Sequence, residues 1–267
     1  MLLLFNRPTT KSFIMKLRHL FALTCAVLLG AATPTQAQFG GGGRPPGANP
    51  ALAKVFGKHT SFSAKAQMKV MDATGKETMS GPVTYAMLEG STYWGMDLSA
   101  MKSAQIPPQA AASMKQMGMA EMVVVNKAGS KSALLIYPGM KAYAETPLPA
   151  EASPEAKSDI KTEVVGEETV NGHKCKKNKV TITDGGKAQE VFTWNATDFK
   201  DFPVRVELKD ASNTVLLDYS DIKLDKPDTK LFEAPAGFTR YESVQALLQG
   251  EMMKRMGGAG GFPPAPK

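Results

Sequence analysis

The chain has 267 residues, with 32 Lys and Arg against 25 Asp and Glu, a formal net charge of +7 at pH 7. The basic side chains are spread singly along the sequence, whereas nucleic-acid binding needs a dense basic patch, so no nucleic-acid partner is expected. Hydrophobic residues make up 43% of the chain. A single hydrophobic core is expected, since all-β domains reach this length undivided.

The first part of the chain has the composition of a secretory signal peptide. A basic start precedes an apolar run over residues 20–29 and a stretch of small residues that ends at Ala37. The run is shorter than the roughly 18 residues that a membrane-spanning helix needs. We therefore expect residues 1–37 to be a signal peptide cleaved near Ala37, with a start at Met1 or Met15 and export to the periplasm.

Export changes the charge and the cysteine count. Four basic and no acidic residues precede the expected cleavage site, which leaves 28 basic against 25 acidic residues. Only Cys175 remains, so no internal disulfide can form and the core must hold the fold. The mature chain is expected to comprise a flexible Gly/Pro-rich segment over 38–57, one domain over 58–256 and a flexible tail over 257–267.

Within the domain, apolar and polar residues alternate with a period of two, the pattern of half-buried β-strands. Turn residues such as Asn171-Gly172 separate the segments. Helices are expected over residues 108–118 and 241–252, the second with a stripe that starts at Tyr241. A mainly β, antiparallel domain of about eleven strands is predicted, over residues 62–70, 79–87, 93–96, 121–126, 132–137, 141–145, 161–170, 173–183, 188–194, 204–208 and 214–222.

Catalytic chemistry is not expected. His59 and His173 are the imidazoles of the mature chain, and neither lies in a recognisable catalytic motif. His173 and Cys175 share a strand face, but two ligands make a poor metal site. The sequence therefore predicts no enzyme, no catalytic residue, no metal site and no cofactor.

Methionine is unusually dense in one region. Eleven of the 16 methionines lie between Met68 and Met140. Three roles remain open: plain core packing, a groove for varied apolar ligands, or a Cu(I) site made of thioethers. The dense group consists of Met96, Met101, Met114, Met117, Met119 and Met122.

Several segments resemble the family of periplasmic outer-membrane lipoprotein carriers (LolA/LolB-like) and its uncharacterised relatives, which include domains of unknown function. The carriers proper use an arginine in an early strand to latch a lid, whereas this chain has no arginine between Arg44 and Arg205. The resemblance is therefore to an uncharacterised branch. The resembling segments are residues 133–143 (ALLIYPGMKAY), 165–175 (VGEETVNGHKC), 201–204 (DFPV) and 230–238 (KLFEAPAGF).

The resemblance implies a strongly curved antiparallel sheet of eleven strands, an open half-barrel with helices plugging its concave face. In the carriers this cavity holds the acyl chains of lipoproteins. The helix over 108–118 and the loop over 146–158 would be the lid.

The leading functional hypothesis is a periplasmic, non-enzymatic protein that binds a lipid, an acyl chain or an acylated lipoprotein in an apolar cavity. The second is an envelope sensor or structural interaction module with a packed core and a protein partner. The third is a Met-rich copper-binding protein. The oligomeric state is left open. The residues expected to line the cavity are Met68, Val70, Val83, Tyr85, Met87, Trp94, Met96, Met114, Met117, Leu135 and Tyr137.

Overall fold

The computed structural model describes residues 50–103, 107–148, 159–184, 187–210 and 212–258. The expected signal peptide lies outside these residues, as do residues 38–49 and most of the expected tail. So does most of the loop proposed as part of a lid, from residue 149 to 158.

The described residues form three α-helices, two 3-10 helices and 13 strands. The helices are α1 (Pro50–Lys54), α2 (Pro108–Gln116) and α3 (Val244–Gly258), and the 3-10 helices are η2 (Pro138–Met140) and η4 (Thr229–Phe232). The strands are β1 (Ser61–Asp72), β2 (Glu77–Leu88), β3 (Ser91–Asp97), β4 (Lys102–Ser103), β5 (Glu121–Asn126), β6 (Ser132–Tyr137), β7 (Ala142–Pro147), β8 (Asp159–Val170), β9 (His173–Asp184), β10 (Lys187–Ala196), β11 (Phe202–Lys209), β12 (Asn213–Lys223) and β13 (Thr239–Tyr241).

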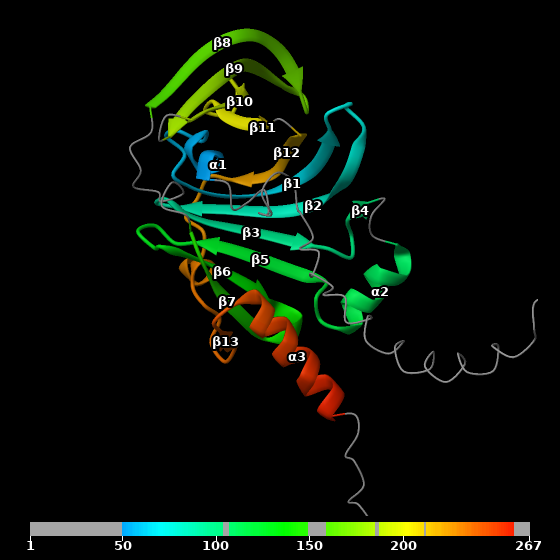
Figure 1. Ribbon diagram of the computed structural model, residues 1–267. Coiled ribbons are helices and arrows are strands. Elements are labelled where there is room, and N and C mark those ends of the chain that lie inside the picture. The colour runs from blue at the N-terminus through cyan, green and yellow to red at the C-terminus, as the bar shows by residue number, and fades with distance from the viewer. Residues whose placement is uncertain (1–49, 104–106, 149–158, 185–186, 211, 259–267) are drawn as a thin grey trace, which may run out of the picture. The chain divides into compact units, whose positions relative to one another are not determined.

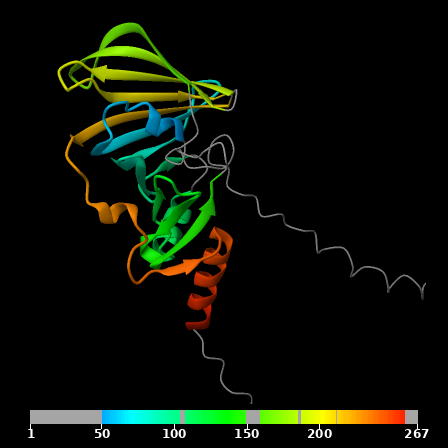
Figure 2. The same ribbon diagram turned by 90° about the vertical axis from the view of Figure 1, so that its left-hand side faces the viewer.

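These strands build one unclosed sheet in the order β13-β7-β6-β5-β3-β2-β1-β12-β11-β10-β9-β8, with β4 beside β2. Apart from the parallel pair of β13 and β7, the neighbouring strands are antiparallel. β1 joins the two halves of the sheet, because it pairs with β2 on one side and with β12 on the other. The strands β8 to β12 curl over α1 (Figures 1 and 2).

The predicted fold class is confirmed. Each of the eleven expected strands is present with its ends within two residues of the prediction, and the two further strands, β4 and β13, have only two and three residues. The helix predicted over 108–118 is α2. The last helix begins later than predicted, because Tyr241 ends β13 and the Ser243 hydroxyl accepts a hydrogen bond from the Ala246 amide at the helix start.

The apolar stripe of α3 also differs from the prediction. Met252 is 54% exposed, whereas Leu247 is fully buried and Glu251 nearly so. The Glu251 carboxylate accepts a hydrogen bond from the Tyr241 hydroxyl at 2.7 Å and lies 2.7 Å from the Lys254 ammonium. The face of α3 that packs against β7 and β13 therefore contains both apolar and charged side chains. Hydrogen bonding compensates for the burial of the carboxylate.

The segment expected to be flexible over 38–57 is corrected at its C-terminal end. Residues 50–54 form α1, and the side chains of Leu52, Val55 and Phe56 are buried in the main hydrophobic cluster. A five-residue helix has little stability of its own, so packing against the sheet must hold it. One plug of the concave side is therefore α1.

A second, smaller cluster covers the opposite face of the sheet. Ala86, Val123, Val125 and Ile136 alternate with main-cluster residues along β2, β5 and β6, and Phe232 of η4 packs on them. These central strands are consequently buried on both faces.

Two glycines allow a close backbone contact between the end of α2 and η2. Gly118 has a positive φ of 69°, and a Cβ added there would lie 2.6 Å from the Gly139 carbonyl oxygen. The Arg255 guanidinium of α3 donates to the Gln116 carbonyl at 2.8 Å in the same region. The position of α2 thus depends on the absence of side chains at these glycines.

We expect Gly118→Ala to lower the free energy of unfolding by about 2 kcal/mol or more, because it combines an unfavourable φ with a backbone clash. The matched control is Gly166→Ala, since no atom lies within 4 Å of a Cβ added there and its φ is not positive. Urea unfolding of both variants is the measurement. Equal stability of the two variants would contradict the close contact.

Candidate ligand-binding face

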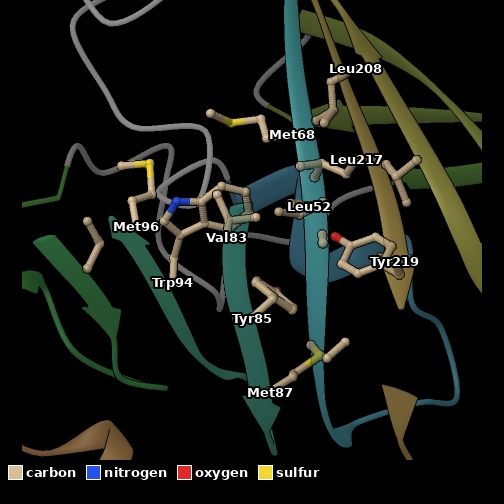
Figure 3. Close-up of a cluster of buried hydrophobic side chains, with 14 of the residues drawn as sticks. Leu52, Met68, Val83, Tyr85, Met87, Trp94, Met96, Leu208, Leu217 and Tyr219 are labelled. Atoms are coloured by element: carbon tan, nitrogen blue, oxygen red, sulfur yellow. The ribbon is translucent and has the colours of Figure 1, made fainter. Parts of the chain in front are cut away.

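One side of the sheet packs against α1, and we call this side the inner face. Along β1 it carries Phe62, Ala64, Ala66, Met68 and Val70, which alternate with more exposed residues. Because directly opposed residues in an antiparallel pair point to the same side, the register carries this face onto the neighbouring strands. Figure 3 shows its central side chains, which come from β1, β2, β3, β11 and β12 together with Leu52 of α1.

The structure brings ten of the eleven predicted cavity residues into the main cluster. Eight are buried, namely Met68, Val70, Val83, Tyr85, Met87, Trp94, Met96 and Tyr137, and two are partly buried against it, namely Met114 and Leu135. Met117, the eleventh, is half-buried and does not belong to the cluster. The structure therefore buries these residues together, while their ligand-binding role stays a prediction.

Aromatic rings fill the centre of the inner face. The Phe56 ring centroid lies 4.6 Å from that of Phe62, 5.4 Å from Tyr85 and 5.6 Å from Tyr219. On β1, Ala64 is opposite Tyr85 and Ala66 is opposite Tyr219. Small side chains on β1 thus leave room for large rings on both of its neighbours.

Three polar atoms inside this apolar surface have no hydrogen-bond partner within the part of the chain that the structure describes. They are the hydroxyls of Tyr85 and Tyr219 and the indole nitrogen of Trp94, and all three atoms are buried. Leaving such a group unpaired costs about 1–3 kcal/mol. Each of these groups is a hydrogen-bond donor for which the described residues provide no acceptor.

The two tyrosines remain neutral over the range in which proteins are stable. Burial raises the pKa of Tyr85 far above its ordinary value, and burial together with the nearby Tyr85 raises the pKa of Tyr219. Both hydroxyls can consequently donate a hydrogen bond, as can the Trp94 indole.

A polar contact fixes the segment that follows α1 to the turn between β10 and β11. The Lys58 ammonium lies 3.3 Å from the Asp201 carboxylate, and the His59 ring nitrogen Nε2 donates to the Lys200 carbonyl oxygen at 3.1 Å. Lys200 and Asp201 have positive φ angles of 55° and 58°, which costs energy in residues other than glycine. This group of four residues is called the α1 latch below.

The sequence interpretation missed part of the inner face. Leu52 and Phe56 are four residues apart after Pro50, a helix-start signal that the glycines and prolines before it obscured. Leu217 and Tyr219 lie in a correctly predicted strand, and its alternation could have identified them. Strands β9 to β11 add the further inner-face residues Val180, Ile182, Val191, Val206 and Leu208.

The methionine-rich group is divided between the core and its margin. Met96 and Met122 are opposite each other on β3 and β5, and both are buried together with Met101. Met119, like Met117, is only half-buried. The buried members pack among hydrocarbon side chains, which favours the apolar roles of the group over thioether ligation.

We expect protonation of His59 to weaken the α1 latch. Burial lowers the pKa of His59 below its ordinary value of 6.5, so the unfolded chain binds this proton more tightly than the folded protein does. The contribution of neutral His59 to stability is therefore fully present above pH 6.5 and is lost as the pH falls through the lowered pKa. Thermal unfolding at about pH 7.5 and about pH 5.5 should show this loss.

The His59→Gln variant provides the test, because glutamine still donates to a carbonyl and does not titrate. Its stability should fall less than that of the unmodified protein over the same pH interval. The control variant His173→Gln, which retains His59, should lose as much stability over this pH interval as the unmodified protein does. An unchanged pH dependence in His59→Gln would contradict the role of this histidine.

Comparisons with known proteins give a family match and a set of distant structural matches. A domain of unknown function (DUF4412) matches residues 83–202, from the middle of β2 to the first residue of β11. A search of curated protein sequences finds no match. Among the described residues, no helix combines the length and the apolar character needed to cross a membrane.

The solved structures that are similar include proteins of the superfamily that the sequence resembles. A LolA superfamily protein from Nitrosomonas europaea matches with 10% identity and a TM-score of 0.34, covering 70% of this chain and 96% of that one. The lipoprotein LppX from Mycobacterium tuberculosis matches with 11% identity and a TM-score of 0.36, covering 68% and 100%. A lipoprotein-sorting protein domain from Vibrio parahaemolyticus matches with 13% identity and a TM-score of 0.32, covering 69% and 95%. At this level of similarity, function has to be derived from the residues of this chain.

Proposed function

We propose that this chain is a non-enzymatic binding protein of the bacterial periplasm that holds a lipid, an acyl chain or an acylated lipoprotein against its inner face. The observation that carries the proposal is the presence of three buried polar atoms, on Tyr85, Trp94 and Tyr219, that have no partner among the described residues and lie within an otherwise apolar surface. An acyl ester or amide has the matching chemistry, because its chain is apolar and its carbonyl oxygen accepts hydrogen bonds.

The position of α1 supports an exchange between the protein and a ligand. Leu52 and Phe56 are 1% and 2% exposed and contact the same face that an acyl chain would contact. Hydrocarbon from a ligand can replace hydrocarbon from these side chains with little change in buried apolar area. Binding would then require that α1 move away and that the α1 latch open.

The first experiment is native mass spectrometry of the protein purified from the periplasm, followed by organic extraction of the bound material. We expect an added mass that disappears after extraction and returns when lipids or lipopeptides are supplied. A clean mass that stays unchanged after incubation with lipids and lipopeptides would overturn the proposal.

Weakening the α1 latch should make the inner face more accessible. Lys58→Glu replaces the attraction to Asp201 by repulsion, and it should raise the apparent affinity for a fluorescent long-chain fatty acid about two- to fivefold. The matched control is Lys65→Glu, which disrupts a comparably exposed pair with Asp221, 2.9 Å long, outside the latch. Equal effects of the two substitutions, or no effect of Lys58→Glu, would contradict a gating role for α1.

The complete burial of the central residues favours a second candidate, an envelope interaction module whose inner face is simply its core. Phe62, Met68, Trp94 and Leu217 are all 0% exposed. A protein partner whose binding is unaffected by substitutions on the inner face, together with a ligand-free mass, would support this alternative.

A further inference from the structure

One edge of the sheet is a long strand with unusual exposure. Among the residues that the structure describes, β8 pairs only with β9, and eleven of its twelve residues are exposed. Of the six large hydrophobic side chains that are exposed within the described residues, three belong to this strand: Ile160 at 45%, Val164 at 59% and Val165 at 44%. An edge strand of this kind presents unpaired main-chain groups beside apolar side chains, and therefore favours the addition of another strand.

The opposite edge is protected. β13 has three residues, and α3 packs against both β13 and β7. Short edge strands covered by a helix are a common protection against unwanted strand pairing. The two edges therefore differ: the β13 edge is short and covered by a helix, whereas the β8 edge is long and exposed.

The register with β9 determines which side chains of β8 lie on the inner face. Ile160 is opposite Ile182 and Thr162 is opposite Val180, and both of these partners belong to the main cluster. The inner face therefore extends to the free edge through Ile160, Thr162 and Val164. Lys161 and Glu163 point to the other side.

The sequence of this edge is complementary to itself. In an antiparallel pair of two β8 strands centred on Thr162, Ile160 of one copy is opposite Val164 of the other, and Lys161 is opposite Glu163. Both kinds of pair stabilise neighbouring strands. Centring the pair on Lys161 or Glu163 would instead place like charges opposite each other.

We propose that β8 pairs with β8 of a second copy of this chain, antiparallel about a two-fold axis at Thr162. The neighbour that Lys161 already has, the Asp159 carboxylate 3.8 Å away, is an exposed contact that contributes little and leaves Lys161 able to pair with a second copy. The register shift between Val164 and Gly166 limits regular pairing to the segment around Ile160 to Val164.

The two-fold arrangement joins two apolar surfaces. Because opposed residues point to the same side, Ile160 and Val164 of both copies would continue one inner face into the other.

This inference does not rest on ligand binding, since a packed core would leave the same edge free. The interface is small, so the dimer should be reversible, with a dissociation constant in about the micromolar range.

Sedimentation velocity over a range of protein concentrations is the first test, made with the purified exported protein. Lys161→Glu puts like charges opposite each other at both symmetry-related pairs and should weaken the dimer about tenfold. Glu163→Lys should weaken it similarly. The double variant Lys161→Glu/Glu163→Lys restores opposite charges across the interface and should recover the affinity of the unmodified protein.

Thr162→Cys gives an independent test of the register. The two-fold axis places this residue opposite its own copy, so mild oxidation should give a disulfide-linked dimer. The control Ser220→Cys introduces an exposed thiol on β12, away from the free edge, and should not cross-link at comparable yield. A protein that stays monomeric at all concentrations, a failure of the double variant to recover affinity, or equal cross-linking of both cysteine variants would overturn the proposal.

Discussion

The pairing of β1 with both β2 and β12 is the constraint on which the rest of the structure depends. It joins a meander from the first half of the chain to one from the second half, so that both contribute to one inner face. The residues of β1 also set the packing there. Ala64 and Ala66 lie beside Tyr85 and Tyr219, and the space that they leave is filled by these rings and by Phe56 of the segment after α1. A larger residue at either alanine would have to displace an aromatic ring from a closely packed core.

The inner face combines close apolar packing with a few polar groups and a short covering helix. It is apolar and closely packed, it contains three donors for which the described residues offer no partner, and it is covered by a five-residue helix that cannot be stable alone. The contacts that fix this helix at its C-terminal side are an exposed ion pair and one hydrogen bond to a turn with two unfavourable φ angles. Most of what holds α1 in place is thus the burial of Leu52, Val55 and Phe56, and the polar contacts of the α1 latch add little to it.

The two faces of the sheet differ in chemistry towards the β8 edge. On the outer side of β9 to β11, the Lys177 ammonium lies 4.7 Å from the Trp194 ring centroid and the Arg205 guanidinium 5.6 Å from the same ring. The Trp194 indole donates to Glu168 of β8, and the Arg205 side chain donates to Asp218 at 2.5 Å. Alternating cations, rings and carboxylates therefore connect β8 to the interior of the sheet on that side. On the inner side the segment from Ile160 to Val164 contributes only apolar and small polar groups, which leaves this part of the free edge compatible with another apolar strand.

The sequence by itself determined the eleven main strands, the class of fold, α2 and the orientation of the strand residues that were expected to line a cavity. These features depend on a period-two pattern that each segment carries independently of its partners, and the pattern is strongest where one face is buried. Only the tertiary structure decided the rest. The helix α1 and the strands β4 and β13 are too short to leave a periodic signal in the sequence. The late start of α3 depends on contacts with distant residues and leaves no such signal either. The contacts of Phe56 with Tyr85 and Tyr219, the α1 latch at Lys200 and Asp201, and the exposure of β8 all depend on which segments meet in space, because burial and strand pairing are properties of contacts between residues far apart in the chain.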